Sequence, residues 1–122
     1  MMIRRAYIAV IDDDESIRES LPDLISMFGH EAEAFSSAEE FLASKLFDQA
    51  KCLVLDIAMP GMSGIELQRE LAQQGRQIPI VFITAHGDEQ VCGRLRRSGT
   101  IECLLKPFTD TMLLDALNAV LR

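Results

Sequence analysis

The chain has 122 residues, which is long enough for one domain whose hydrophobic core is stable without disulfides or structural metal ions. Its 48% hydrophobic and 25% charged content is ordinary for a globular protein, and its net charge of −7 argues against non-specific nucleic-acid binding by this chain. No apolar run approaches the roughly 20 residues of a membrane span, and the N-terminus lacks a signal-peptide pattern. We therefore expect a single domain over residues 1–122, located in the cytoplasm and without membrane contact.

The first third of the chain predicts a strand, a helix and an edge strand. Residues 7–11 (YIAVI) form a short, branched apolar run, as in strands that are covered on both faces. Apolar residues then recur at helical spacing over 17–28, and Pro22 interrupts them. We prefer a helix kinked at Pro22, and a helix whose regular part starts near 20–22 is the alternative. Residues 31–35 (EAEAF) alternate, which suits an edge strand.

Two capping boxes frame the next buried strand. Ser37 with Glu40 predicts the start of a second helix, and Ser63 with Glu66 predicts the start of a third. Between them, residues 52–55 (CLVL) have the length and composition of a buried strand. This part of the chain therefore continues the alternation of strands and helices.

The last third repeats the pattern twice, less clearly in its first helix. After Gly75, the predicted stop of the third helix, the elements are, in order, a strand over 80–83 (IVFI), a helix over 88–97, a strand over 103–105 (CLL) and a helix from near Thr109. The helix over 88–97 is the weakest, because Gly93 lies in its middle and three arginines leave little apolar face. Alternating strands and helices with short connections predict an α/β fold, a parallel sheet with helices on both faces.

Polar side chains follow the predicted buried strands. They are Asp12, Asp13 and Asp14 after the first, Asp56 after the third, Thr84 after the fourth, and Lys106 with Pro107 after the fifth. A single polar residue after a strand can simply mark where the chain reaches solvent. This does not explain why every predicted central strand is followed by such a residue. In such folds, ligands bind beyond the carboxyl ends of the strands. Hard oxygen ligands suit Mg²⁺, and no glycine-rich phosphate loop or serine nucleophile motif is present. A carboxylate is then the natural nucleophile, as in aspartyl phosphates.

Four segments, VIDDDE, LVLDIAMPGMSGIEL, IPIVFITAHGD and LLKPF, resemble in order and spacing the receiver domain of two-component response regulators. The stretch over 56–64 is the part most specific to this family. The segments ITAHGD and KPF are similar to those in receivers of nitrogen-fixation-type transcriptional regulators. The resemblance implies a flavodoxin-like (βα)5 fold, a five-stranded parallel sheet of order 2-1-3-4-5. It also implies a phosphoacceptor switch without metabolic activity, which catalyses only its own aspartyl phosphorylation and dephosphorylation.

The same resemblance implies roles for individual residues. Asp56 would accept a phosphoryl group from a sensor histidine kinase. Asp12, Asp13, Asp56 and the backbone carbonyl of Ala58 would hold Mg²⁺ or Mn²⁺. Thr84 would contact the phosphoryl group and report its arrival, and Lys106 would pair with it, aimed by a cis bond to Pro107. Asp14, in contrast, is expected to cap the first helix.

Further partners follow from the resemblance as expectations. A phosphorylation-dependent homodimer would use the face made by the fourth helix, the fifth strand and the last helix. DNA is expected to be bound only through a downstream domain that is not in this chain.

The sequence departs from the family at two places. The family usually has an aromatic residue three positions before the lysine, and here it is Cys103, so we expect altered signalling with phosphorylation intact. The segment CGRLRRSGT replaces a more apolar helix, and its arginines form either a solvated face or a partner surface. We expect this segment to be mobile or partly unwound. His86 is interpreted as a bystander rather than a base.

The three cysteines, Cys52, Cys92 and Cys103, show no ligand-like spacing. We interpret them as small, semi-buried thiols in a reducing compartment, with redox or metal roles as the alternative.

Two other functions remain open. An aspartyl-phosphate phosphatase of the haloacid-dehalogenase type is disfavoured, because such enzymes carry a second acid two residues after the nucleophile, where this chain has Ala58. A phosphorylation-independent interaction module on the same fold is the second alternative.

Overall fold

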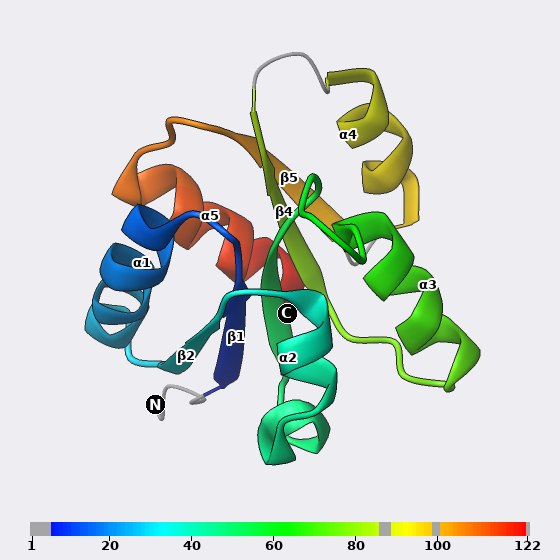
Figure 1. Ribbon diagram of the computed structural model, residues 1–122. Coiled ribbons are helices and arrows are strands. Elements are labelled where there is room, and N and C mark those ends of the chain that lie inside the picture. Colours follow the sequence, from blue (N-terminus) through cyan, green and yellow to red (C-terminus); the bar gives the residue numbers. More distant parts are fainter. Residues whose placement is uncertain (1–5, 86–88, 99–100, 122) are drawn as a thin grey trace.

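Figure 1 shows the computed structural model of the chain, which describes residues 6–85, 89–98 and 101–121. One parallel sheet of order β2-β1-β3-β4-β5 contains the strands β1 (Tyr7–Ile11), β2 (Glu31–Phe35), β3 (Cys52–Asp56), β4 (Ile80–Thr84) and β5 (Ile101–Leu105). The helices are α1 (Glu15–Met27), α2 (Ala38–Leu42), α3 (Gly64–Gln73), α4 (Glu89–Leu95) and α5 (Asp110–Leu121), with 3-10 turns η1 (Lys45–Asp48) and η2 (Arg96–Ser98). The expected flavodoxin-like sheet order is confirmed.

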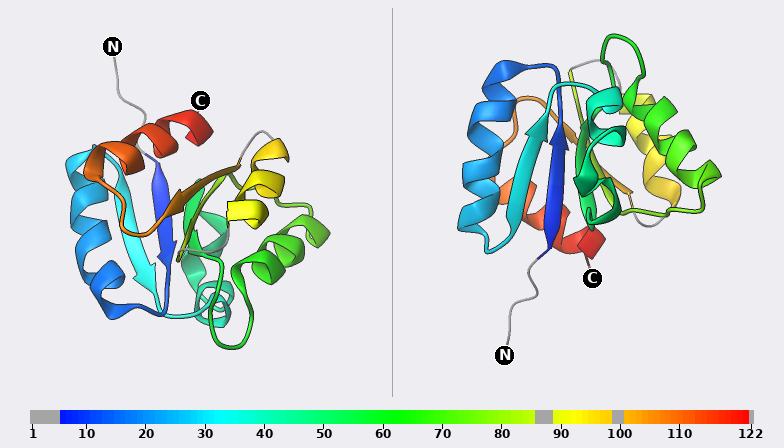
Figure 2. Two further views of the ribbon diagram at one scale, coloured as in Figure 1. Left: turned by 90° about the horizontal axis from the view of Figure 1, so that it is seen from above. Right: turned by 60° about the horizontal axis from the view of Figure 1, so that its bottom comes forward.

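The helices form one layer on each side of the sheet. α1 and α5 cover one face, and α2, α3 and α4 cover the other (Figure 1 and Figure 2). Successive residues of β4 alternate between the two cores: Phe82 packs with the α2–α4 layer, and Ile83 packs with the α1–α5 layer. This explains why the central strands read as unbroken apolar runs. Among the described residues, no helix combines the length and apolar composition that a membrane span requires.

Helix α1 begins at Glu15, before the start near residues 20–22 that one of the two sequence interpretations gave. Its N-cap is Asp14, whose side chain accepts a hydrogen bond from the Ser16 backbone N–H, and the helix continues through Pro22. The alternative in which regular helix begins near residues 20–22 is therefore wrong. The predicted cap at Asp14 is confirmed, and it keeps this carboxylate at the first turn of α1.

Both predicted capping residues lie at helix starts. At α3 the box is complete, because Ser63 and Glu66 each accept a hydrogen bond from the other's backbone N–H. At α2, Ser37 accepts from the Glu40 N–H, but the Glu40 carboxylate accepts from Ser36 instead. The start of α2 is thus held by a variant of the predicted box.

The helix predicted over 88–97 is short. α4 has seven residues, and the turn that follows it, η2, is a 3-10 turn. Asp88 lies outside the described residues, and the expected mobility of the segment stays a prediction. β5 begins at Ile101, two residues earlier than predicted, so η2 is closely followed by the last strand.

Candidate functional site

The carboxyl ends of four strands bring the predicted polar residues to one edge of the sheet. Asp12 follows β1, Asp56 ends β3, Thr84 ends β4 and Lys106 follows β5. Asp12, Asp56 and Thr84 are the polar or charged residues that are buried within the described chain. Because burying such groups is costly unless they have partners, their concentration at one edge indicates a functional site.

Three carboxylates form the centre of this edge. One oxygen from each of Asp12, Asp13 and Asp56 lies within 4.8 Å of the others. Asp13 is exposed, whereas Asp12 and Asp56 are buried. The pKa of Asp56 is raised to about 7: burial is the largest cause, the hydrogen bond and negative charge of Asp12 add to it, and Lys106 and the Ala58 N–H act against it. The raised pKa shows that this pocket favours an added positive charge.

Lys106 supplies part of that charge. Its Nζ atom lies 3.0 Å from Asp12 Oδ2 and 3.7 Å from Asp56 Oδ2. Burial acts to lower the pKa of Lys106, but the hydrogen bond to Asp12 and the charges of Asp56 and Asp12 outweigh it, so the pKa is raised. The ammonium group is therefore charged at neutral pH, where it contacts both buried carboxylates.

The residues present fit a divalent cation. Asp12 Oδ2 is buried, and the polar contact recorded for it among the described residues is the 3.0 Å ion pair with the Lys106 ammonium group. The cluster holds three carboxylates, and Lys106 contacts two of them, so its negative charge exceeds what a single ammonium group offsets. Oxygen donors of this kind suit Mg²⁺ or Mn²⁺. Of the predicted ligands, Ala58 donates its N–H to Asp56 Oδ1 over 3.2 Å, and the role of its carbonyl stays a prediction.

Backbone hydrogen bonds hold the site residues in register. The Lys106 N–H donates to the Thr84 carbonyl over 2.8 Å, which joins the ends of β4 and β5. The Asp14 N–H donates to Asp12 Oδ1 over 2.9 Å and fixes that carboxylate. The Lys106–Pro107 bond is cis, as expected. These local bonds place the lysine and the two buried carboxylates on rigid elements.

Two further residues support this edge, and sequence reasoning missed the first of them, Arg18. Arg18, on α1, donates from its guanidinium group to the Asp12 carbonyl over 3.1 Å. Gly64, the first residue of α3, approaches the Asp56 backbone so closely that an added Cβ would overlap the Asp56 carbonyl oxygen. The signal for Arg18 is its position four residues after the Asp14 cap, which places it on the first turn of α1.

The structure separates the remaining predicted residues from the cluster. Cys103 lies in the middle of β5 and forms a disulfide with Cys92 of α4. The interpretation of these two cysteines as free thiols is therefore wrong, although both are buried as expected. Cys52 is a buried free thiol, and burial raises its pKa to about 12. His86 lies outside the described residues.

The arginines of the segment around α4 are not equivalent. Arg94 and Arg97 are exposed, in line with a solvated face. Arg96 is also largely exposed, but its guanidinium group donates a hydrogen bond to the Cys103 carbonyl. A solvated face therefore does not account for Arg96, which links η2 to β5.

Known proteins are similar to this chain in sequence and in fold. The sequence profile of the response regulator receiver domain matches residues 8–118. Nodulation protein W of Bradyrhizobium diazoefficiens is 46% identical over 115 residues, which are 94% of this chain and 51% of that protein. The transcriptional regulatory protein FixJ of Rhizobium meliloti is 37% identical over 109 residues, which are 89% of this chain and 53% of that protein.

A solved structure agrees with the sequence matches. The response regulator StyR is 48% identical with a TM-score of 0.85, over 97% of this chain and 60% of that one. The chain thus spans about half the length of the curated relatives it matches. Since the profile covers nearly all of the described residues and the site lies at the strand ends, the chain belongs to the response regulator receiver domain family of two-component signal transduction.

Proposed function

We propose that this chain is a phosphoacceptor switch in which Asp56 accepts a phosphoryl group from a sensor histidine kinase, in a reaction that depends on Mg²⁺ or Mn²⁺. The observation that supports this most directly is the buried pair Asp12 and Asp56, with Asp13 beside them and the Lys106 ammonium group between the buried carboxylates. Receiver domains in general are signalling domains rather than metabolic enzymes, and they bind Mg²⁺ through acidic residues.

The proposed step needs a nucleophile and neutralisation of charge. An oxygen of Asp56 attacks the phosphorus of a kinase phosphohistidine, the P–N bond breaks, and the imidazole leaves with the electron pair and takes up a proton. The product is an acyl phosphate on Asp56. Phosphoryl transfer asks chiefly for alignment and charge stabilisation, which Lys106 provides from a fixed position near Asp56.

The proposed metal ligands are Asp12, Asp13, Asp56 and the carbonyl of Ala58. A bound Mg²⁺ would supply charge stabilisation for the phosphoryl oxygens. Thr84, buried at the end of β4, is proposed to contact the phosphoryl group and to report its arrival. The backbone bond from Lys106 to the Thr84 carbonyl supports this pairing, because it holds the two residues on adjacent strands.

We propose that residues 1–122 form a single receiver domain of a longer regulator. Relatives named as transcriptional regulators are about twice the length that this chain spans, which supports an output domain beyond it. DNA would then be bound through that domain, and the place of action would be the cytoplasm. The α4–β5–α5 surface is proposed to change on phosphorylation and to form a homodimer.

The test is phosphorylation with a small acyl phosphate. The chain is incubated with this donor and Mg²⁺, and intact-mass spectrometry measures the addition of one phosphoryl group. Asp56→Asn is expected to abolish the addition. Asp14→Asn is the matched control, because Asp14 caps α1 and its substitution leaves the acidic cluster in place. Addition to Asp56→Asn, or none to the unmodified chain, would contradict the proposal.

One observation favours a second function. Cys103 is engaged in a disulfide where the family usually has an aromatic residue, which keeps a phosphorylation-independent interaction module as the alternative. Under that alternative, the chain takes up no phosphoryl group under conditions that modify an ordinary receiver. An aspartyl-phosphate phosphatase would instead turn over small phosphate esters repeatedly.

A further inference from the structure

We propose that Cys92 and Cys103 form a reversible redox site that sets how far α4 can move away from β5. Peroxides close the disulfide and small dithiols open it. The effect on signalling rests on the proposed phosphoacceptor function, whereas the redox site itself does not. The site joins the two elements that lie between Thr84 and Lys106 in the chain, and it therefore acts on the proposed output face.

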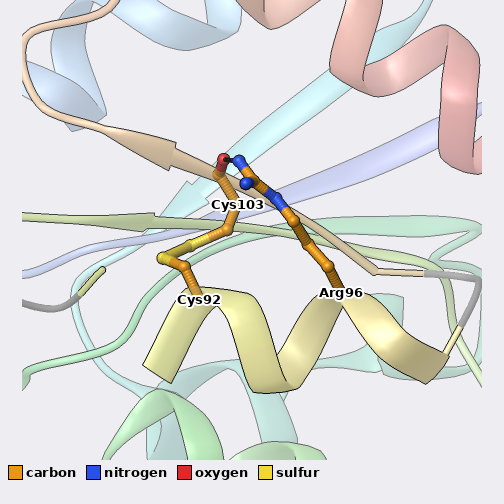
Figure 3. Close-up of a disulfide and its surroundings, with 3 residues drawn as sticks. All are labelled: Cys92, Arg96 and Cys103. Atoms are coloured by element: carbon orange, nitrogen blue, oxygen red, sulfur yellow. Dashed lines mark hydrogen bonds between the residues drawn. A yellow bond between two sulfur atoms is a disulfide. The ribbon is translucent and has the colours of Figure 1, made fainter. Parts of the chain in front are cut away.

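The disulfide joins two different elements across a short distance. Figure 3 shows Cys92 of α4 pointing toward Cys103 of β5, with the bond between them. Their Cα atoms are 5.6 Å apart, within the range usual for disulfides. Both side chains are almost fully buried, at 4% and 2% exposed. Cysteines held this close by packing can pair without any rearrangement of the backbone.

Within the part of α4 whose side chains the structure describes, buried side chains are few, so the disulfide is a large part of the buried contact between α4 and the sheet. Among the α4 side chains that the structure describes, Cys92 is the buried one, with Val91 and Leu95 partly buried. A Cβ at Gly93 would meet no atom within 4 Å, so no packing surrounds that position. When the disulfide opens, the apolar contact that holds this seven-residue helix is therefore limited.

A second link converges on the same strand residue. The Arg96 guanidinium group donates to the Cys103 carbonyl, so side chain and backbone of Cys103 are both tied to the α4 segment (Figure 3). Arg96 is exposed, and one hydrogen bond that is open to water is weaker than a covalent tether. We expect the Arg96 contact to guide α4 back to β5, and the disulfide to hold it there.

The tether lies close to the phosphoacceptor site along the chain and across the sheet. Cys103 comes three residues before Lys106, and it pairs with Phe82 in the register that also pairs Leu105 with Thr84. α4 begins five residues after Thr84. Thr84 and Lys106, two residues of the site, therefore flank the segment that contains α4 and β5. The disulfide joins these two elements within that segment. A closed tether restricts any movement of α4 that the site requires.

The chemistry balances with a peroxide as oxidant. One thiolate attacks a peroxide oxygen, the O–O bond breaks, and a sulfenic acid forms as hydroxide leaves. The second thiol attacks that sulfur and displaces water, so two thiols and one hydrogen peroxide give one disulfide and two waters. A dithiol reverses the change by two exchange steps, which return two thiols and leave the reductant as a cyclic disulfide. In a cytoplasmic protein, a disulfide of this kind is usually transient and regulatory.

The first experiment tests the redox site without reference to phosphorylation. The whole chain is treated with hydrogen peroxide or dithiothreitol, the disulfide is located by non-reducing peptide mass mapping, and amide hydrogen exchange is measured over residues 89–98. We expect a peptide that links Cys92 to Cys103 after peroxide, and α4 exchange at least about tenfold slower than in the reduced chain. Equal exchange in the two states, or no such peptide, would overturn the proposal.

Variants separate the tether from general oxidation. Cys92→Ser is expected to show the fast exchange of the reduced chain under both treatments. Cys52→Ala is the matched control, because Cys52 is a buried thiol on β3 that packs in the core on the other face of the sheet, and it should keep the full redox response. Loss of the response in Cys52→Ala would overturn the assignment. Since dithiothreitol acts on the unsubstituted chain, the test does not depend on how well a variant folds.

The second experiment tests the link to signalling. Oxidised and reduced chains are treated with an acyl phosphate and Mg²⁺, and both phosphoryl addition and α4 exchange are measured. We expect addition to Asp56 in both redox states, with a further change in α4 exchange in the reduced state alone. The same change in both states would overturn the link. No addition in either state would refute the proposed function, while redox-dependent exchange of α4 would still support the redox site.

Discussion

At the scale of single residues, Asp56 is held in an environment that disfavours its charge. Burial is the largest cause, and the neighbouring Asp12 adds to it, while Lys106 and the Ala58 N–H act in the opposite direction. The resulting pKa of about 7 lies well above the usual value for an aspartate. A divalent cation would replace the proton as the source of positive charge, so proton and metal should compete for this cluster.

This competition predicts a pH-dependent affinity for Mg²⁺. Below about pH 7, where Asp56 takes up a proton, the apparent dissociation constant should rise by up to about tenfold for each pH unit. Isothermal titration calorimetry at several pH values measures it. Asp56→Asn should bind Mg²⁺ more weakly and lose this pH dependence. An affinity that stays constant between pH 8 and pH 6 would contradict the role given to Asp56.

The same pKa has a consequence for stability without metal. Because the pKa of Asp56 is higher in the folded chain than in the unfolded chain, protonation favours folding. The stabilisation is complete below the ordinary value of 3.8 and is lost as the pH rises through about 7. In the presence of a chelator, the thermal midpoint of Asp56→Asn at pH 8 should therefore exceed that of the unsubstituted chain by a few degrees.

His30 provides a stability effect of opposite sign. Its Nδ1 atom accepts the Ala6 N–H over 3.0 Å, and burial lowers its pKa. Since the folded chain disfavours the protonated imidazole, the stability that His30 contributes is present above the ordinary pKa of 6.5 and is lost as the pH falls below it. Urea unfolding at pH 7.5 and 5.5 should show a smaller loss in His30→Asn than in the unsubstituted chain. An equal loss would contradict this.

The site residues were predictable from sequence because a parallel sheet presents the carboxyl ends of its strands together. That rule places Asp12, Asp56 and Lys106 at one edge before any coordinates are known. It does not tell which carboxylate the lysine contacts, since this depends on the strand order and on a long side chain that reaches from β5 back to Asp12 beside β1. Arg18 was missed because its contact with the Asp12 carbonyl also depends on the reach of a long side chain.

At the scale of secondary structure elements, local signals located the helix starts and the tertiary contacts set their lengths. Asp14 and Ser63 cap α1 and α3 where the sequence places them. The 3-10 turn η1 was not predicted, although Ser44 caps it; Phe47 packs against Phe41 there and the Arg76 guanidinium group lies over the Phe47 ring. The disulfide was missed because its two cysteines belong to different elements, and the spacing of 11 residues between them does not tell that α4 packs against β5.

Substitution by alanine should change the free energy of unfolding in opposite directions at Gly64, which starts α3, and at Gly93, which lies inside α4. At Gly64 an added Cβ would overlap the Asp56 carbonyl, so Gly64→Ala should lower the free energy of unfolding by about 1–3 kcal/mol and weaken Mg²⁺ binding. At Gly93 the same Cβ meets no atom within 4 Å, so Gly93→Ala should stabilise α4 by up to about 1 kcal/mol. Urea unfolding of both variants measures the difference, and a stabilised Gly64→Ala would contradict the close approach.

At the scale of the whole molecule, the sheet divides the interior into two cores that share its strands. The α2–α4 side and the α1–α5 side each contain a continuous cluster of buried apolar residues. The site lies at the edge where both layers end, and the disulfide lies within the α2–α4 core. Movement of α4 would therefore repack one core while the other continues to hold the sheet, so a local switch need not unfold the domain.

This division predicts that substitutions in the two cores act independently. Ile25 of α1 and Ile80 of β4 are almost fully buried in different clusters, on opposite sides of the sheet. Ile→Val at either position removes one methylene group and should cost about 0.5–1.5 kcal/mol. With no shared cavity, the double variant should lose the sum of the two within about 0.5 kcal/mol.

Denaturant unfolding of the two single variants and the double variant, all fully reduced, measures this sum. Ile80→Val combined with Ile101→Val is the control for coupling, because these residues pair directly across β4 and β5 and belong to the same cluster. That pair should deviate from additivity more than the pair on opposite faces. A coupling between Ile25 and Ile80 as large as the coupling between Ile80 and Ile101 would show that the sheet transmits repacking from one layer to the other, and α4 could then not move without disturbing α1 and α5.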